Sequence, residues 1–100
     1  MEVTLTENGY LQIPADIARQ YFPEDVLVAI VKNTELWLLP LRGAAAGGLM
    51  LKQRNLQGDR SVIIWEVLNR ASSDIPVGVK PAFWDDRSKA LRVALIRDPT

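Results

Sequence analysis

Apolar and polar residues alternate near the start of the chain, which is the pattern of two half-buried strands. The sequence EVTLT at 2–6 and the sequence YLQI at 10–13 each place their aliphatic residues on one face. A three-residue turn sets Leu5 opposite Leu11, whereas a two-residue turn would mix the two faces. Gly9 ends that turn, where a left-handed conformation costs glycine nothing. We therefore predict a hairpin with a three-residue loop.

Prolines mark both ends of a short helix after this hairpin. Residues 15–22, ADIARQYF, follow Pro14, whose missing N–H is harmless at the start of a helix. The helical period places three side chains on one face: Ile17, Ala18 and Tyr21. Pro23 ends the helix, because the residue before a proline avoids the helical region.

Three later runs are apolar on both faces, which is typical of strands that are covered on two sides. These runs are residues 26–31, 36–41 and 62–68. A two-residue loop between the first two runs pairs Lys32 with Glu35. A small sheet buries only one face, so we expect the surplus apolar surface to be covered by the helix, by the other half of the chain or by a second subunit.

The second half of the chain predicts two more hairpins. Residues 49–55 pair with 62–68, residues 81–84 pair with 90–96, and residues 69–80 form a loop. The inward side chains of the last strand are Leu91, Val93 and Leu95. About eight short strands and one short helix predict a mainly β fold, either a small barrel or a two-sheet domain.

The length of 100 residues predicts a single domain. Within it, residues 1–41 form one half, the Gly/Ala-rich residues 42–48 a connection, and residues 49–100 a second, hairpin-containing half. The chain carries no long apolar run and no basic, apolar leader, so we expect no membrane span and no signal peptide. These features favour a cytoplasmic protein.

The composition excludes several kinds of chemistry. The chain has no cysteine and no histidine, which removes thiol nucleophiles, imidazole acid–base catalysis and the usual zinc sites. Carboxylate or lysine chemistry and an all-oxygen metal site are the routes left to an enzyme. We therefore expect a protein that is not an enzyme and needs no cofactor and no metal.

Residues 3–41 resemble the swapped-hairpin domain of AbrB/MazE-type transcription factors and antitoxins. The matching segments are GYLQIPADIA at 9–18, EDVLVAIV at 24–31 and ELWLLP at 35–40. The resemblance implies an intertwined homodimer in which each chain lends strands to a shared barrel. In the DNA-binding members, basic residues of the first hairpin and near the helix contact phosphates and bases.

The charges of this half depart from that family. Tyr10 stands where the family commonly places an arginine. Residues 1–40 contain two bases, Arg19 and Lys32, against six acids: Glu2, Glu7, Asp16, Glu24, Asp25 and Glu35. Because phosphate contacts supply most non-specific affinity for DNA, this half is expected to repel a duplex. The resemblance then implies the fold and the dimer, with DNA binding as the alternative function.

A basic segment at 41–60 is one candidate binding site. Its bases, against Asp59 alone, are Arg42, Lys52, Arg54 and Arg60. With the flanking glycines they suit an anion or phosphate, although the segment has no Gly-Lys-Ser/Thr motif. The alternative is a linker followed by a solvated strand edge, where charges prevent edge-to-edge pairing. Residues 57–60, QGDR, read as a tight turn.

The tryptophans and two adjacent aspartates are the other candidates. Buried Trp often anchors protein interfaces, and the three here are Trp37, Trp65 and Trp84. For the first two we favour a place in the core, and for Trp84 core and interface are equally open. Asp85 and Asp86 read as a hairpin tip, because neighbours on an extended chain point in opposite directions.

These observations leave three functions. The first is a small β module, a dimer, that binds a protein partner in an accessory or maturation role. The second is an AbrB/MazE-like regulator or antitoxin that binds nucleic acid, which the charge of the N-terminal half opposes. The third is a small enzyme or ligand-binding barrel that uses residues 42–60. The balanced net charge and the missing catalytic residue types favour the first.

Overall fold

The computed structural model describes residues 1–42, 47–71 and 75–96. In these residues nine strands and two helices form a mainly β fold. The fold class is the one that the sequence predicts, with one strand and one helix more than expected. The strands are β1 (Glu2–Leu5), β2 (Tyr10–Ile13), β3 (Val26–Lys32), β4 (Glu35–Pro40), β5 (Leu49–Met50), β6 (Lys52–Gln53), β7 (Arg60–Ile63), β8 (Gly78–Asp85) and β9 (Ala90–Ala94). The helices are α1 (Ala15–Tyr21) and α2 (Trp65–Ala71), and neither is long and apolar enough to cross a membrane.

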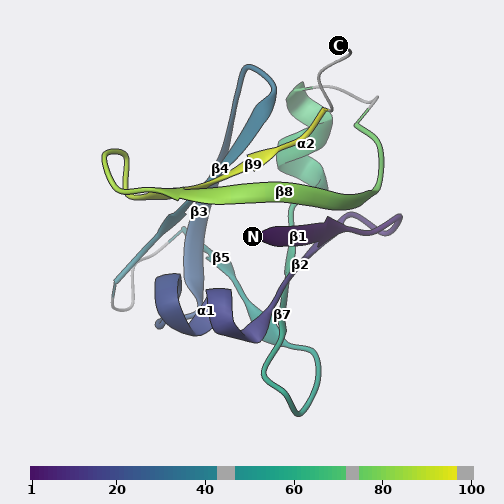
Figure 1. Ribbon diagram of the computed structural model, residues 1–100. Coiled ribbons are helices and arrows are strands. Elements are labelled where there is room, and N and C mark those ends of the chain that lie inside the picture. The colour runs from purple at the N-terminus through teal and green to yellow at the C-terminus, as the bar shows by residue number, and fades with distance from the viewer. Residues whose placement is uncertain (43–46, 72–74, 97–100) are drawn as a thin grey trace.

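The nine strands belong to one antiparallel sheet that is rolled into a nearly closed barrel. Their order is β5-β3-β4-β9-β8-β1-β2-β7-β6, and β5 comes back close to β7. The C-terminal strands β8 and β9 therefore lie between β4 and β1, so both halves of the sequence build the same barrel. Figure 1 shows the long strand β8 beside β1, with α1 below and α2 above β8 in this view.

The interior of the barrel is mostly aliphatic, and Phe22 is the aromatic residue among its almost fully buried side chains. The side chains that are almost fully buried are Val3, Leu11, Ile13, Phe22, Leu27, Leu36, Leu38, Val62, Ile64, Leu91 and Val93. They come from seven different elements or their flanks, because alternate residues of each strand face inward. Phe22 directly follows α1, and its buried side chain packs the C-terminal end of this helix against the core.

The first two predicted hairpins have the expected register. Leu5 lies opposite Leu11, and Lys32 lies opposite Glu35. Gly9 has a φ of +82° and its N–H donates to the Thr6 carbonyl at 3.1 Å, as a three-residue loop requires. The inward face of β9 also matches the prediction, since its leucines and valine are buried.

The prediction of a strand over residues 62–68 is wrong beyond residue 63. The chain turns into α2, where Ile64 and Leu68 are buried four residues apart and the Leu68 N–H donates to the Ile64 carbonyl at 3.1 Å. Glu66 near the start and Arg70 near the end of the helix suit its dipole. A short apolar run hides this period, because strand and helix patterns fit it equally well.

Two neighbouring predictions are corrected for related reasons. The predicted loop 69–80 begins inside α2 and ends inside β8, and its residues 72–74 lie outside the described part. The predicted strand 49–55 is two short strands, β5 paired with β3 and β6 paired with β7, separated by the buried Leu51. Of the predicted connection 42–48, residues 43–46 lie outside the described part.

Candidate binding surfaces

The predicted basic site does not come together as one cluster. Arg42 follows β4 and lines a cavity near α1, whereas Lys52 and Arg54 are exposed at the β6 side of the β6–β7 hairpin. Arg60 lies on β7, opposite Gln53. The spacing along the chain does not reveal that β3 lies between β4 and β5, or that Arg42 lines a cavity that Lys52, Arg54 and Arg60 do not line.

Arg60 has a structural role at the base of the barrel. Its Nε donates to Asp25 Oδ1 at 2.9 Å, and its Nη1 donates to the Gly58 carbonyl at 2.6 Å. Asp25 has a φ of 57°, so the ion pair holds a residue in an uncommon backbone conformation. Arg60 therefore ties the β6–β7 hairpin to the start of β3.

The QGDR turn fastens the first helix. Asp59 Oδ1 accepts the N–H of Ala15 at 2.8 Å, and Asp59 Oδ2 accepts the side-chain amide of Asn55 at 2.9 Å. These two hydrogen bonds, followed by the charge of Arg54, hold the pKa of Asp59 below its usual value against the opposing effect of burial. The Asp59 carboxylate, 44 residues along the chain from Ala15, thus accepts a hydrogen bond from an N–H that has no partner within α1.

Asp85 and Asp86 lie at the β8–β9 turn, as predicted. Asp85 accepts the Arg87 N–H at 3.0 Å, whereas Asp86 accepts Trp84 Nε1 at 3.2 Å and Lys89 Nζ at 3.1 Å. The two carboxylates thus have different partners and do not converge on one point. The turn therefore does not form an acid–base pair that could face a single substrate.

The outer face of the barrel carries a row of side chains that crosses four strands. Ile30 on β3 lies opposite Trp37 on β4, Trp37 lies opposite Arg92 on β9, and Arg92 lies opposite Phe83 on β8. We call these four residues the outer row. Directly opposed residues share a face, and the sequence neighbours Leu36, Leu38, Leu91 and Val93 are buried, so the outer row points outward.

Aromatic rings and charges pack against each other within the outer row. The Arg92 guanidinium carbon lies 4.7 Å from the Trp37 ring centre and 4.8 Å from the Phe83 ring centre, and Lys32 Nζ lies 4.4 Å from the Trp37 ring centre. These are cation–π distances. The apolar ends of the row remain accessible, with Ile30 37% and Phe83 47% exposed.

Carboxylates hold Arg92 in this position. Its Nε and Nη2 donate to Glu35 Oε1 at 2.9 and 2.7 Å, and its Nη1 donates to Asp85 Oδ2 at 3.1 Å. The hydrogen bond to Glu35 is the main reason that the pKa of Arg92 rises above its usual value. Trp37 Nε1 also donates to Glu35 Oε1, at 3.1 Å, so the polar groups of the row are largely satisfied.

The predicted core positions of two tryptophans are wrong. Trp37 is half-buried on the outer face, and Trp65 at the start of α2 is 49% exposed. Both strand runs looked apolar on two faces, so the sequence did not show which face the core would take. The local β3–β4 hairpin places Ile30 opposite Trp37, whereas Arg92 and Phe83 reach this face only through the non-local pairing of β4 with β9. The sequence therefore does not bring the four residues together.

A second surface feature is a cavity of about 410 Å³ between α1, the end of β4 and the β8–β9 hairpin. Its main lining residues, which we call the aromatic pocket, are Tyr21, Pro23, Pro40, Arg42, Trp84 and Lys89. The rings of Tyr21 and Trp84 are stacked, with centres 4.4 Å apart and planes 13° apart. The structure thus brings two predicted site residues, Arg42 and Trp84, into one cavity.

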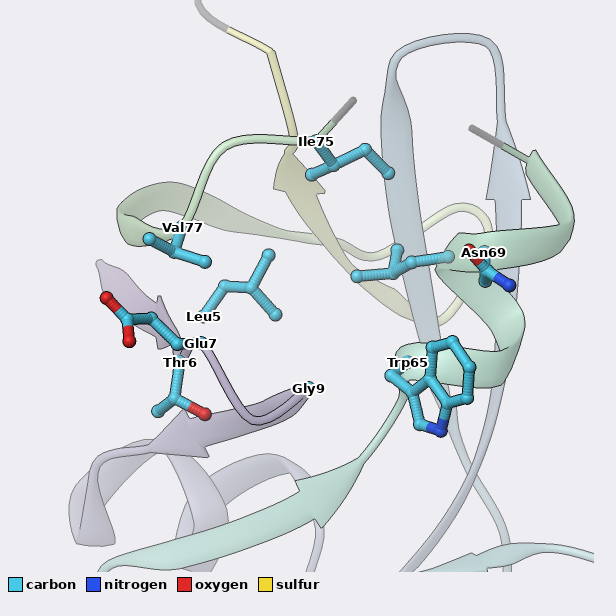
Figure 2. Close-up of a pocket in the computed structure, with 9 residues that line it drawn as sticks. Leu5, Thr6, Glu7, Gly9, Trp65, Asn69, Ile75 and Val77 are labelled. Carbon is cyan, nitrogen blue, oxygen red and sulfur yellow. The ribbon is translucent and has the colours of Figure 1, made fainter. Parts of the chain in front are cut away.

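A smaller cleft of about 200 Å³ lies between the β1–β2 turn, α2 and residues 75–77. Figure 2 shows Leu5, Ile75 and Val77 around its apolar centre, while the Glu7 carboxylate points away from Trp65. Ligand sites are typically larger than roughly 300 Å³ and have polar groups that converge on the ligand. This cleft has neither property, so it ranks below the aromatic pocket.

Lys80 is a buried cation that the sequence placed in a loop. It faces the barrel interior on β8, only 7% exposed, and its Nζ donates to the Leu95 carbonyl at 3.0 Å. Burial lowers the pKa of this ammonium group. Alternation of exposed and buried residues along β8 places Lys80 on the inward face, a position that the loop-like composition of residues 69–80 hides.

The described residues contain no group of three or more Asp and Glu side chains placed to hold a metal ion. Comparison with known proteins adds no assignment, since no family model, curated protein or solved structure matches the chain. The structure defines the chain as a small, mainly β, barrel-like fold.

Proposed function

We propose that the chain is a non-enzymatic binding module that works as a homodimer and serves a protein partner in an accessory or maturation role. The observation that carries this proposal is the outer row, in which the exposed Ile30 and Phe83 flank the half-buried Trp37 and Arg92 across four paired strands. Trp, Tyr and Arg are the residue types most enriched in the energetic centres of protein interfaces.

The outer row suits a protein surface better than water. Its rings and aliphatic side chains gain by leaving solvent, and its polar groups keep their partners when water is removed. Arg92 is already bonded to Glu35 and Asp85, so covering it leaves few unsatisfied donors. A contact here therefore avoids much of the desolvation cost of an unpaired charge.

A second copy of the chain is the occupant that the charges favour. A two-fold interface places the same patch on both sides, so a patch of one sign would repel itself. The outer row and its neighbours hold two cations and two carboxylates, namely Lys32, Arg92, Glu35 and Asp85. This balance, together with the exposed Val28 and Ile30 on β3, supports self-association through the outer row.

The non-enzymatic part of the proposal is supported by the side chains available. The chain has no histidine and no cysteine. The carboxylates Glu35, Asp59 and Asp85 are each occupied in hydrogen bonds that shape the fold. Groups that are committed in this way are poor general acids or bases.

Light scattering of the purified protein tests the proposal. We expect twice the 11.2 kDa mass of the chain, in both low and high salt, because an apolar interface does not weaken when charges are screened. A mass of 11.2 kDa at tens of micromolar would contradict the dimer.

Adding bulk duplex DNA to the same measurement tests the alternative of an AbrB/MazE-like regulator. We expect no bound species even in low salt, because the acids of residues 1–40 outnumber the bases and repel phosphate. A complex that dissociates as salt rises would replace the protein-binding proposal with DNA binding.

A further inference from the structure

We infer that the aromatic pocket is a second binding site, separate from the outer row, whose ligand is a small planar aromatic anion. The first support is its size, since a cavity of about 410 Å³ lies within the roughly 300–1,000 Å³ that small-molecule sites occupy. The second is that three parts of the chain distant in sequence converge on it: α1, the end of β4 and the β8–β9 hairpin.

Two stacked aromatic rings and two prolines supply most of the apolar wall of the pocket. Tyr21 and Trp84 stack almost parallel, so the pair forms a rigid shelf in place of two independent rings. Pro23 and Pro40 add apolar surface and offer no N–H donor. A flat apolar group buries the most surface against such walls, and an aromatic ring gains a stacking contact as well.

The charged groups of the lining are both cationic. Arg42 and Lys89 line the cavity, and among the residues that the structure describes no Asp or Glu lines it. Guanidinium and ammonium groups are donors only, so they are complementary to a group that only accepts hydrogen bonds, such as a carboxylate, sulfonate or phosphate. Together the shelf and the cations define a ligand that is flat at one end and anionic at the other.

One carboxylate beside the pocket opposes an anion. Asp86 Oδ1 accepts Trp84 Nε1 at 3.2 Å and Lys89 Nζ at 3.1 Å. The Lys89–Asp86 pair is highly exposed, with side chains 72% and 86% accessible, and such pairs are weak. Lys89 is therefore able to exchange Asp86 for a ligand anion, while Asp86 lowers the affinity that the pocket would otherwise have.

Two fluorescent dyes of the same shape test this site in the intact protein. Anilinonaphthalene sulfonate carries an anion, whereas phenylnaphthylamine is its neutral counterpart. In fluorescence titrations we expect the wild-type protein to bind the anionic dye about tenfold more tightly than the neutral dye, through charge-assisted contacts. Equal affinities, or no fluorescence increase with either dye, would overturn the inference.

Variants assign that preference to the pocket. The double variant Arg42→Gln with Lys89→Gln is expected to lose the preference for the anion and to keep its affinity for the neutral dye. Asp86→Asn keeps an acceptor for Trp84 and removes a repulsive charge, so the anionic dye should bind about threefold more tightly. Arg87→Gln is the matched control on the same hairpin, outside the lining, and should change neither affinity.

Either of two results with the variants would overturn the site. One is a preference for the anion that survives the double variant, which would place the dye on another apolar surface. The other is a preference that Arg87→Gln abolishes as completely as the double variant does. The mass of each variant by light scattering separates this test from the dimer proposal, since the pocket is separate from the outer row.

Discussion

Replacing Trp37 with glutamate is expected to convert the proposed dimer into a folded monomer. The new carboxylate lies beside Glu35 at the centre of the outer row. In a two-fold interface the carboxylates of both copies would face each other after losing their hydration water, which is unfavourable. Loss of a central aromatic anchor in an interface costs about 2 kcal/mol or more, which weakens the dimer at least about thirtyfold. Lys32 and Arg92 lie beside the position and can pair with the new charge in the monomer.

Light scattering and circular dichroism together check this expectation. The mass should fall to that of one chain while the β-sheet spectrum is retained. Phe83→Glu, at the exposed end of the outer row, should have the same effect with less risk to folding. Leu56→Glu is the matched control, because Leu56 is fully exposed on the β6–β7 turn. A folded dimer that carries both Trp37→Glu and Phe83→Glu would contradict the proposed face.

Replacing Gly9 with alanine is expected to destabilise the fold by about 3 kcal/mol. Its φ of +82° costs an L-residue about 1 kcal/mol. A Cβ at this position would also lie 2.3 Å from the Trp65 Cβ, so the β1–β2 turn and α2 would have to move apart. Overpacking of this kind adds about 2 kcal/mol.

Gly58→Ala separates the two causes. Gly58 has a φ of +95°, yet the nearest atom to an added Cβ is 3.6 Å away. Its substitution should therefore cost only the backbone strain, about 1 kcal/mol. Urea unfolding of both variants measures the difference. Equal losses of unfolding free energy would mean that α2 does not pack against the turn as the structure shows.

The local pairing of the chain could be predicted from its sequence. Leu5 lies opposite Leu11 because alternation and the position of Gly9 allow only one register. Lys32 lies opposite Glu35 for the same reason, since a two-residue loop leaves little choice. In both hairpins the decisive information lies within a dozen neighbouring residues.

The arrangement of distant strands could not be predicted in this way. Nothing near Trp37 indicates that Arg92 will lie beside it, because β8 and β9 enter the sheet between β4 and β1 only in the folded chain. The same holds for the aromatic pocket, where Tyr21 and Trp84 meet across 63 residues. Candidate binding surfaces depend on such contacts. The sequence therefore indicates Arg42 and Trp84 as candidates but does not indicate that Tyr21 and Lys89 lie beside them.

The helix α2 shows a different limit. The run from Val62 to Leu68 is apolar at nearly every position, so its period is hidden. Burial of Ile64 and Leu68, four residues apart, becomes visible only when the chain is seen to leave the sheet after Ile63. Trp65 is exposed for the same reason, because it begins α2 where the chain leaves the sheet.

The most direct test of the proposed dimer face is the rate at which a single cysteine reacts with a maleimide. The natural chain has no cysteine, so Ile30→Cys carries one thiol on the outer row, and Leu56→Cys carries one on a distant turn. We expect labelling of Ile30→Cys to slow at least about tenfold as protein concentration rises through the dimer range, while labelling of Leu56→Cys stays constant. Constant labelling of Ile30→Cys while the mass doubles would show that the chains associate through another face.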